Sequence, residues 1–258
     1  MTEHAAGTGI DPTRQWLLTA GVTGLLALVG AALLTHGSDD VATVRFVAGV
    51  AVGLAAISAV IRRCLEAARR EAGPEPISGA TWITLARGAA TVVLAGFLFA
   101  APTDGLTLWV PAALFGLAAG FDAVDGAVAR ATDTVSTVGG RLDVEIDSIT
   151  VLVGTLLAVS FGGAAVAFLL VGVARYAFVA GITVRRRRQL PVYEMDPSER
   201  RRAVGAATMI ATWLVLLPVP GPSVSWALSV VVLIPFVASF GRDWLVVSGR
   251  LDVGTDPQ

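Results

Sequence analysis

Apolar runs of about 20 residues recur along the chain, and they limit its fold more than any other feature. A run of this length crosses the hydrocarbon core of a bilayer as a helix. Charged residues make up only 15% of the sequence, whereas a soluble domain carries about 25%. The runs lack the period-two alternation of barrel strands, so helices must satisfy the backbone hydrogen bonds in lipid. We therefore expect an all-α integral membrane protein.

The apolar runs predict eight transmembrane helices. One uncharged run, Ile149–Ala174, is too long for a single span, and Phe161-Gly162-Gly163 in its middle predicts a turn. This run therefore divides into helices at about 140–160 and 164–184. The other six predicted spans are Trp16–Thr35, Val41–Ile61, Ala80–Ala101, Leu106–Phe121, Ala203–Val219 and Val224–Gly241.

Arginines gather on alternate loops, and this asymmetry predicts the orientation in the cell membrane. The Arg-rich loops, including residues 185–188 and 200–202, are expected to be cytoplasmic. Both termini then lie in the cytoplasm, as an even number of spans requires. The predicted parts are an N-terminal two-helix hairpin at 1–61, a charged cytoplasmic linker at 62–79, a six-helix core at 80–246 and a tail at 247–258.

Two pairs of aspartates stand where one apolar run ends and the next begins. Asp122 and Asp125 are three residues apart and Asp143 and Asp147 four apart, so each pair shares a helix face. Ionisable groups near membrane depth are costly and usually functional, so plain loop aspartates explain this pattern poorly. Oxygen ligands without His or Cys favour Mg²⁺ or Mn²⁺, and two such ions can clamp a phosphoryl group.

The same stretch fits the pattern D-x2-D-G-x2-A-R-x8-G-x3-D-x3-D without a mismatch. It resembles the signature of the CDP-alcohol phosphatidyltransferase family, and residues 76–246 resemble the six-helix core of that family. The resemblance implies an enzyme that joins a CDP-linked lipid to a small alcohol and releases CMP. It also implies two divalent metal ions per active site and a homodimer. The arginine distribution places the aspartates, and so the active site, at the cytoplasmic face. The eight matching residues are Asp122, Asp125, Gly126, Ala129, Arg130, Gly139, Asp143 and Asp147.

The resemblance assigns roles to these residues. Asp147 would be the general base for the acceptor hydroxyl as well as a metal ligand, and Asp143 would share the catalytic site. Asp122 and Asp125 would be metal ligands. The CDP pocket would be formed by Asp125, Gly126, Ala129, Arg130, Gly139 and Thr84, with a turn hydroxyl at Thr134, Ser136 or Thr137.

The first helix of the family core often begins with N-x2-T-x2-R. Here Thr84 and Arg87 fit this pattern, but Thr81 stands where Asn is usual, which puts the role of that position in doubt. Arg87 either binds the acceptor or extends its side chain to the membrane interface.

The acceptor is expected to carry its own phosphate. Arg175 lies ten residues before the 185–188 run, about 15 Å inward on a helix, where an arginine should face a cavity. Its guanidinium suits a phosphate, as in glycerol 3-phosphate or an inositol phosphate, and Arg141 and one of residues 200–202 would complete the site. The alternatives are a structural pair between Arg175 and a carboxylate, and an unphosphorylated acceptor such as serine.

A membrane cation transporter is the competing class, and a non-catalytic membrane scaffold is a further alternative. Transporters place their sites near the midplane, often on broken helices and in repeated halves. This chain has its carboxylates near an interface and shows no internal repeat. The expected partners are the lipid donor, the alcohol acceptor and membrane lipids, with no nucleic acid.

Overall fold

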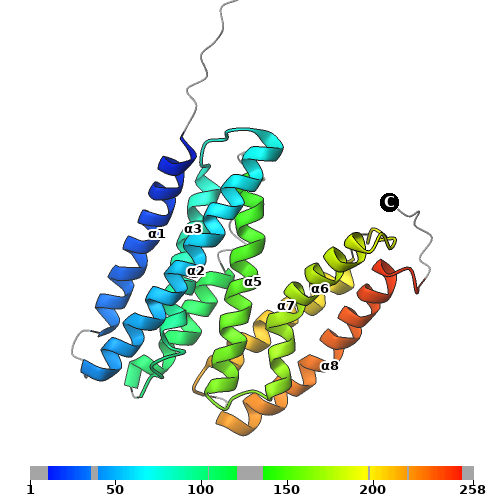
Figure 1. Cartoon of the computed structure of the whole chain (residues 1–258). Helices are drawn as coiled ribbons and strands as arrows, with labels where there is room; N and C mark the ends of the chain where they lie inside the picture. The colour runs from blue at the N-terminus through cyan, green and yellow to red at the C-terminus, as the bar shows by residue number, and fades with distance from the viewer. Residues whose placement is uncertain are drawn as a thin grey trace, which may run out of the picture. The chain divides into compact units, whose positions relative to one another are not determined.

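The computed structural model describes residues 11–35, 40–103, 105–120, 136–196, 198–219 and 221–251. Within these residues the chain is helical and has no β-strand (Figure 1). A 3₁₀ turn at Gly105–Trp109 leads into a helix over residues 110–120, and a second 3₁₀ turn at Val166–Phe168 precedes α6. The long helices are α1 (Pro12–Thr35), α2 (Asp40–Ala72), α3 (Gly79–Gly96), α5 (Thr137–Ser160), α6 (Leu169–Arg187), α7 (Glu199–Leu216) and α8 (Gly221–Val247).

Four described segments are long and apolar enough to cross a membrane: Pro12–Thr35, Val41–Ala72, Val166–Arg187 and Gly221–Val247. A shorter apolar helical segment covers Gly105–Gly120. The remaining helices α3, α5 and α7 correspond to other runs in the sequence but carry charged residues. The all-α prediction is confirmed for the described residues, whereas the count of eight spans stays a prediction.

The chain divides into two compact units. The first contains Met1–Pro102 and Ala113–Thr150, and the second contains Thr103–Ala112 and Val151–Gln258. Helix α5 contributes its first half to the first unit and its second half to the second. The predicted division into hairpin, linker, core and tail is not tested by this clustering.

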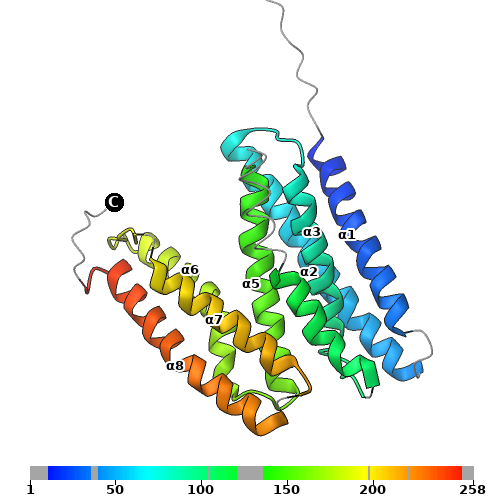
Figure 2. The same ribbon diagram turned by 180° about the vertical axis from the view of Figure 1, so that it is seen from behind.

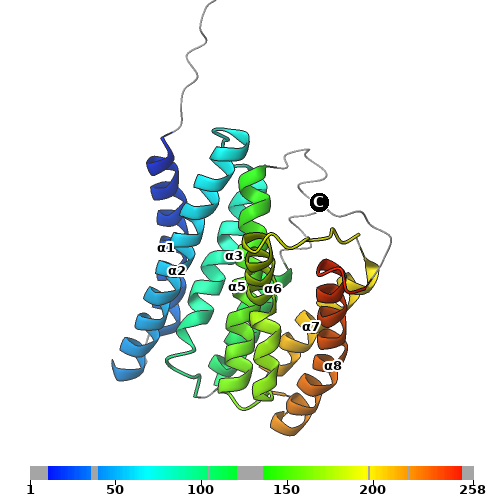
Figure 3. The ribbon, with the colours of Figure 1, turned by 45° about the vertical axis from the view of Figure 1, so that its right-hand side comes forward.

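In the first unit, α1, α2 and α3 run side by side in all three views (Figures 1, 2 and 3). Small residues permit the close approach of α2 to α3. A Cβ atom on Gly49 would lie 2.9 Å from the Gly96 Cα, and one on Gly53 would lie 3.3 Å from the Val92 carbonyl oxygen. The N-terminal hairpin is therefore packed directly against α3.

Helix α2 is longer than the sequence predicts. It continues through most of the charged segment expected to be a linker and ends at Ala72. Glu66 accepts from Arg62 at 2.9 Å and pairs with Arg70 at 3.6 Å, both at helical i,i+4 spacing. Gly73 then adopts a positive φ of 84°, a backbone conformation that ends helices.

The second unit contains α6, α7, α8 and the end of α5. The predicted turn in the long uncharged run is present, because α5 ends at Ser160 and Gly162 has a φ of 73°. Helices α6 and α7 each pack against α8. Arg185 donates to the Pro191 and Ser248 carbonyl oxygens at 2.8 and 3.1 Å, which ties the segment after α6 to the end of α8.

Candidate active site

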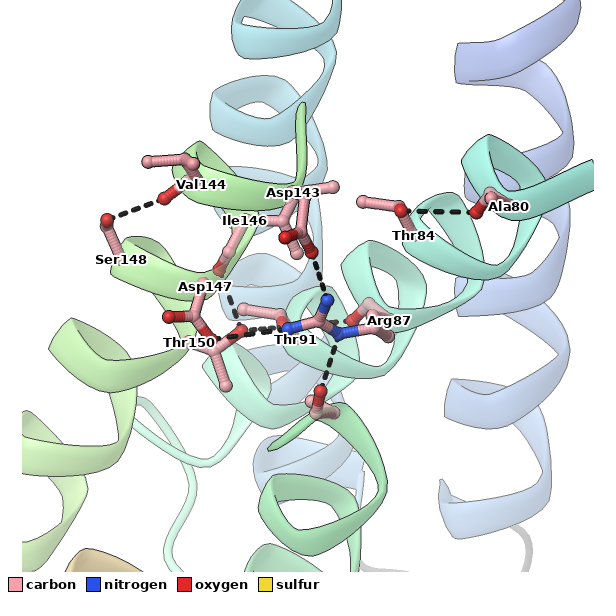
Figure 4. Close-up of polar contacts among 11 residues, drawn as sticks. Ala80, Thr84, Arg87, Thr91, Asp143, Val144, Ile146, Asp147, Ser148 and Thr150 are labelled. Atoms are coloured by element: carbon pink, nitrogen blue, oxygen red, sulfur yellow. Dashed lines mark hydrogen bonds and ion pairs between the residues drawn. The ribbon is translucent and has the colours of Figure 1, made fainter. Parts of the chain in front are cut away.

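Two aspartates of α5 share one arginine of α3 (Figure 4). Arg87 Nη1 pairs with Asp143 Oδ1, and Arg87 Nη2 lies 3.2 Å from Asp147 Oδ1. Arg87 Nε donates to the carbonyl oxygen of Ala118, at 2.6 Å. Both carboxylates therefore face the same side of α5, as their spacing of four residues predicts.

Burial makes these contacts necessary. The Arg87 side chain is 0% exposed, whereas those of Asp143 and Asp147 are 36% and 34% exposed. A guanidinium keeps its charge in proteins, and an unpaired buried charge costs several kcal/mol. Two carboxylates and a carbonyl compensate it here through charge-assisted hydrogen bonds. The alternative that Arg87 extends to the membrane interface is wrong, because no part of its side chain reaches the surface.

Close packing of α3 on α5 brings these groups together. A Cβ atom on Gly88 would lie 3.2 Å from Ile146 Cδ1, so the absence of a side chain lets the helices approach. One turn beyond Arg87, the hydroxyls of Thr91 and Thr150 lie 2.7 Å apart in the buried interior. This buried hydrogen bond pairs polar groups that would otherwise lose water without compensation.

The N-terminal ends of α3 and α5 also meet. Ser78 caps α3 by accepting from the Thr81 amide at 3.2 Å, and the Thr81 hydroxyl lies 3.3 Å from that of Ser136. Ser136 in turn accepts from the Gly139 amide at 3.0 Å, as an N-cap residue does. Thr81, the departure from the family pattern, thus links the two helix ends.

A model of the family described as CDP-alcohol phosphatidyltransferase matches residues 78–238, from the N-cap of α3 into α8. The chain belongs to the CDP-alcohol phosphatidyltransferase family. The resemblance seen in the sequence is therefore confirmed. No curated protein and no solved structure matches the chain.

Membership gives the coarse function. Enzymes of the CDP-alcohol phosphatidyltransferase family transfer a phosphatidyl group from a CDP-alcohol to an alcohol in phospholipid synthesis, and they generally use divalent metals. Together with the four candidate spans, this makes the chain a multi-pass membrane transferase. The matched region begins at residue 78, so α1 and α2 lie outside it.

Half of the predicted metal site falls on described residues. Asp143 and Asp147 present partly exposed carboxylates on one face of α5, and such oxygen donors fit Mg²⁺ or Mn²⁺. Among the residues that the structure describes, no three His, Cys, Asp or Glu side chains gather into a fuller metal site. The other predicted ligands and pocket residues, Asp122, Asp125, Gly126, Ala129, Arg130 and Thr134, lie outside the described residues.

Two predicted CDP-pocket residues have local structural partners. The Thr84 side chain is buried, and its hydroxyl donates to the Ala80 carbonyl oxygen at 3.2 Å. A Cβ atom on Gly139 would lie 2.8 Å from the Thr81 hydroxyl oxygen and 2.9 Å from that of Ser136. Glycine at 139 is therefore required by the meeting of the helix ends, whatever its part in binding CDP.

The predicted acceptor residues are distributed over both units. Arg141 forms an ion pair with Glu71 in the first unit. In the second unit, Arg175 is half-buried on α6, and Arg200 binds Asp243 and Ser239 of α8 at 2.9 and 2.7 Å. Their proposed roles in acceptor binding stay predictions.

Sequence reasoning missed the partners of the carboxylate helix. The N-x2-T-x2-R pattern marked Arg87, but nothing in it indicated that Asp143 and Asp147 are its counter-charges. Glu71 and Glu75, which contact the first turns of α5, were seen only as part of a charged segment. No local spacing pointed to these contacts, because Glu75 lies beyond the end of α2 at Ala72 and its partner Thr137 is 62 positions away.

Proposed function

We propose that this protein transfers a lipid-phosphoryl group from a CDP-linked lipid to the hydroxyl of a phosphorylated polyol and releases CMP. Glycerol 3-phosphate and an inositol phosphate are the acceptors that we favour. The carrying observation is the pair of carboxylates on α5, which one buried arginine of α3 holds. Both carboxylates belong to the eight-residue motif, which lies inside the region that the family model matches.

Four aspartates, Asp122, Asp125, Asp143 and Asp147, are proposed to hold two divalent cations, Mg²⁺ or Mn²⁺. When bound, such ions neutralise charge on the diphosphate and polarise the phosphoryl oxygens. Arg87 orients the two carboxylates of α5, because each places one oxygen on its guanidinium.

Asp147 is the proposed general base. Its carboxylate would accept the proton of the acceptor hydroxyl as the oxygen attacks the lipid-side phosphorus and CMP departs. Asp143, four residues earlier, would help to hold the reacting groups in place. Orientation by Arg87 matters because small misplacements of reacting groups reduce rates strongly.

The nucleotide pocket is proposed around the motif. Gly126 and Ala129 would leave room for CDP beside the carboxylates, and Arg130 would bind a phosphate. Gly139 belongs to the proposed set through the motif, although the space that a side chain would take there is filled by the Thr81 and Ser136 hydroxyls. Thr84 and Thr134 complete the proposed set. The family's use of a CDP-alcohol supports this assignment.

Arg175 is the proposed ligand for the acceptor phosphate. Arg175 lies on α6, about 15 Å inward from the arginines at its end, and its planar fork suits phosphate. Arg141, which pairs with Glu71, and one of residues 200–202 are the further candidates for this phosphate. The site is proposed to face the cytoplasm in a homodimer with both termini on the cytoplasmic side, in keeping with the loop arginines.

The acceptor is tested by CMP release from the purified protein in detergent with a CDP-lipid and Mg²⁺. Glycerol 3-phosphate, an inositol phosphate, serine and no acceptor are compared. Release with a phosphorylated polyol supports the proposal, and release with serine alone contradicts the acceptor assignment. No release with any acceptor contradicts the proposed activity.

Arg175→Gln sharpens this test. It should raise KM for the phosphorylated acceptor about tenfold, the effect of losing a hydrogen bond to a charged group, and leave KM for the CDP-lipid unchanged. Arg187→Gln, an exposed arginine on the same helix, is the matched control. Equal KM values for the two variants would contradict the role of Arg175.

A further inference from the structure

An acidic residue from the N-terminal segment binds the start of the carboxylate helix. Glu75 Oε2 accepts from the Thr137 amide at 3.0 Å, and Glu75 Oε1 accepts from the Thr137 hydroxyl at 3.1 Å. Thr137 is the first residue of α5, where backbone amides have no partner within the helix. Glu75 thus supplies from a distant part of the chain a contact that a helix end needs.

A second contact lies one turn further along α5. Arg141 pairs there with Glu71, near the end of α2, and both side chains are about half exposed. An exposed ion pair alone contributes little to stability. Beside the Glu75 contact, however, it fixes a second point on the same end of the helix. The end of α2 lies next to the start of α5 (Figure 3).

The contact extends back to α1. Gln15 Nε2 donates to the Glu75 carbonyl oxygen at 2.9 Å. Trp16 Nε1 donates to the Ser58 carbonyl oxygen at 3.1 Å, which joins α1 to α2. Both helices that precede the family region therefore support the segment that carries Glu75.

These contacts lie close to the carboxylates. Asp143 follows Thr137 by six residues, less than two helical turns, and Asp147 follows one turn later. A shift at the end of a helix is transmitted along its axis. The positions of Thr137 and Arg141 therefore determine the positions of both aspartates. A simple membrane anchor would need apolar helices but no polar contacts with α5.

We propose that residues 11–77 position the carboxylate helix α5 for catalysis, with Glu75 and Glu71 as the positioning residues. This inference rests on the proposed function, in which the α5 carboxylates bind metal and accept a proton. It assigns a role to a segment that lies outside the family region.

The test compares Glu75→Ala and Glu71→Ala with Glu66→Ala in the full-length protein. Glu66 is the matched control, because its ion pairs with Arg62 and Arg70 lie near the same end of α2 and within that helix. Glu75→Gln is the conservative variant, since its amide oxygen accepts from the Thr137 amide and its NH₂ donates to the hydroxyl.

Two measurements are made on each variant. Hydrogen exchange of the amides in residues 138–147 reports the order of α5 without any ligand. The Mg²⁺ concentration that gives half-maximal CMP release reports the placement of the carboxylates, whereas partial unfolding lowers only the maximal rate. We expect Glu75→Ala to raise the amide exchange rate and the half-saturating Mg²⁺ concentration about fivefold, the scale of a lost helix cap. Glu71→Ala should raise these two quantities about twofold. Glu75→Gln and Glu66→Ala should have exchange rates and half-saturating Mg²⁺ concentrations near those of the wild type.

The outcomes separate this inference from the proposed function. The inference would be overturned if Glu75→Ala and Glu66→Ala had the same amide exchange rates and the same half-saturating Mg²⁺ concentration. Raised exchange with unchanged half-saturating Mg²⁺ would also overturn it, since α5 would be loosened without effect on the site. If the wild type releases no CMP, the proposed function fails, and hydrogen exchange alone tests the positioning of α5. Faster exchange in Glu75→Ala than in the wild type would then support the positioning role. Exchange at the wild-type rate would overturn it.

Discussion

Arg87 shows how much one residue can organise in an apolar setting. Its buried guanidinium uses three nitrogen atoms to bind two carboxylates of α5 and the carbonyl oxygen of Ala118, so its fork geometry matters as well as its charge. Lysine carries the same charge as a single point and cannot bridge both carboxylates in this way.

Arg87→Lys should therefore lower the free energy of unfolding by about 1.5–3 kcal/mol, the scale of a lost hydrogen bond between charged groups. CMP release should fall about 100-fold, because the carboxylates lose their common orientation. Thermal unfolding and CMP release measure the two effects. Arg70→Lys is the control, since Arg70 forms only an exposed pair. Near-wild-type turnover in Arg87→Lys would show that the shared guanidinium is not needed.

At the residue scale, the sequence identified the candidate site residues but did not predict which of them form ion pairs. The spacing of Asp143 and Asp147 predicts their common face, and the motif marks Arg87. Their pairing joins residues 56 and 60 positions apart. Such a contact depends on how α3 packs against α5, which no local pattern contains.

The helix ends are the next scale, and the start of α5 is held on two sides. Ser136 and Thr81 link it to α3, and Glu75 links it to the segment before α3. A Cβ atom on Gly139 would lie 2.8 Å from the Thr81 hydroxyl oxygen and 2.9 Å from that of Ser136.

Gly139→Ala should destabilise the protein by about 1–3 kcal/mol, because the new methyl group needs space that two hydroxyl oxygens occupy. Gly140→Ala is a matched control on the next residue, where a Cβ atom meets nothing within 4 Å. It should stabilise by about 0.4–1 kcal/mol through reduced freedom of the unfolded chain. Thermal unfolding of both variants checks the contrast, and an equal loss in both would contradict the packing argument.

The helix boundaries lie where the sequence predicts them when glycine residues and the apolar pattern mark the same position. The turn at 161–163 divides the long apolar run as predicted, because Gly162 adopts a positive φ. Helix α2 differs, since ion pairs around Glu66 continue it through a segment that charge alone marked as a linker. The charged residues of this segment therefore lie within the helix and do not end it.

For the whole molecule, the sequence identified the all-helical class and the family. It did not predict that the N-terminal helices share a compact unit with the start of α5. That arrangement depends on glycine contacts between α2 and α3 and on the contacts of Glu71 and Glu75. These contacts form only when the helices are packed together, so the sequence does not reveal them.

The orientation predicts a labelling contrast. Asp196→Cys, in the segment after the Arg-rich end of α6, should resist a membrane-impermeant maleimide in intact cells, because positive loops stay in the cytoplasm. Val219→Cys, 69% exposed in the Pro-rich turn, should react. The native Cys64 is buried. Labelling of Asp196→Cys alone would reverse the proposed orientation.

The most direct test of the proposed transfer is metal-dependent CMP release by the purified protein and its Asp147→Asn variant, with a CDP-lipid and the acceptor found for the wild type. Chelation should abolish release, and added Mg²⁺ or Mn²⁺ should restore it in the wild type. Asp147→Asn should still fold, because the amide oxygen can accept from Arg87 and Asp143 keeps its charge. It should lose at least about 100-fold in rate, the lower range for a lost general base. Asp196→Asn, an exposed position, should behave as wild type. Release that persists after chelation, or in Asp147→Asn, would contradict the account.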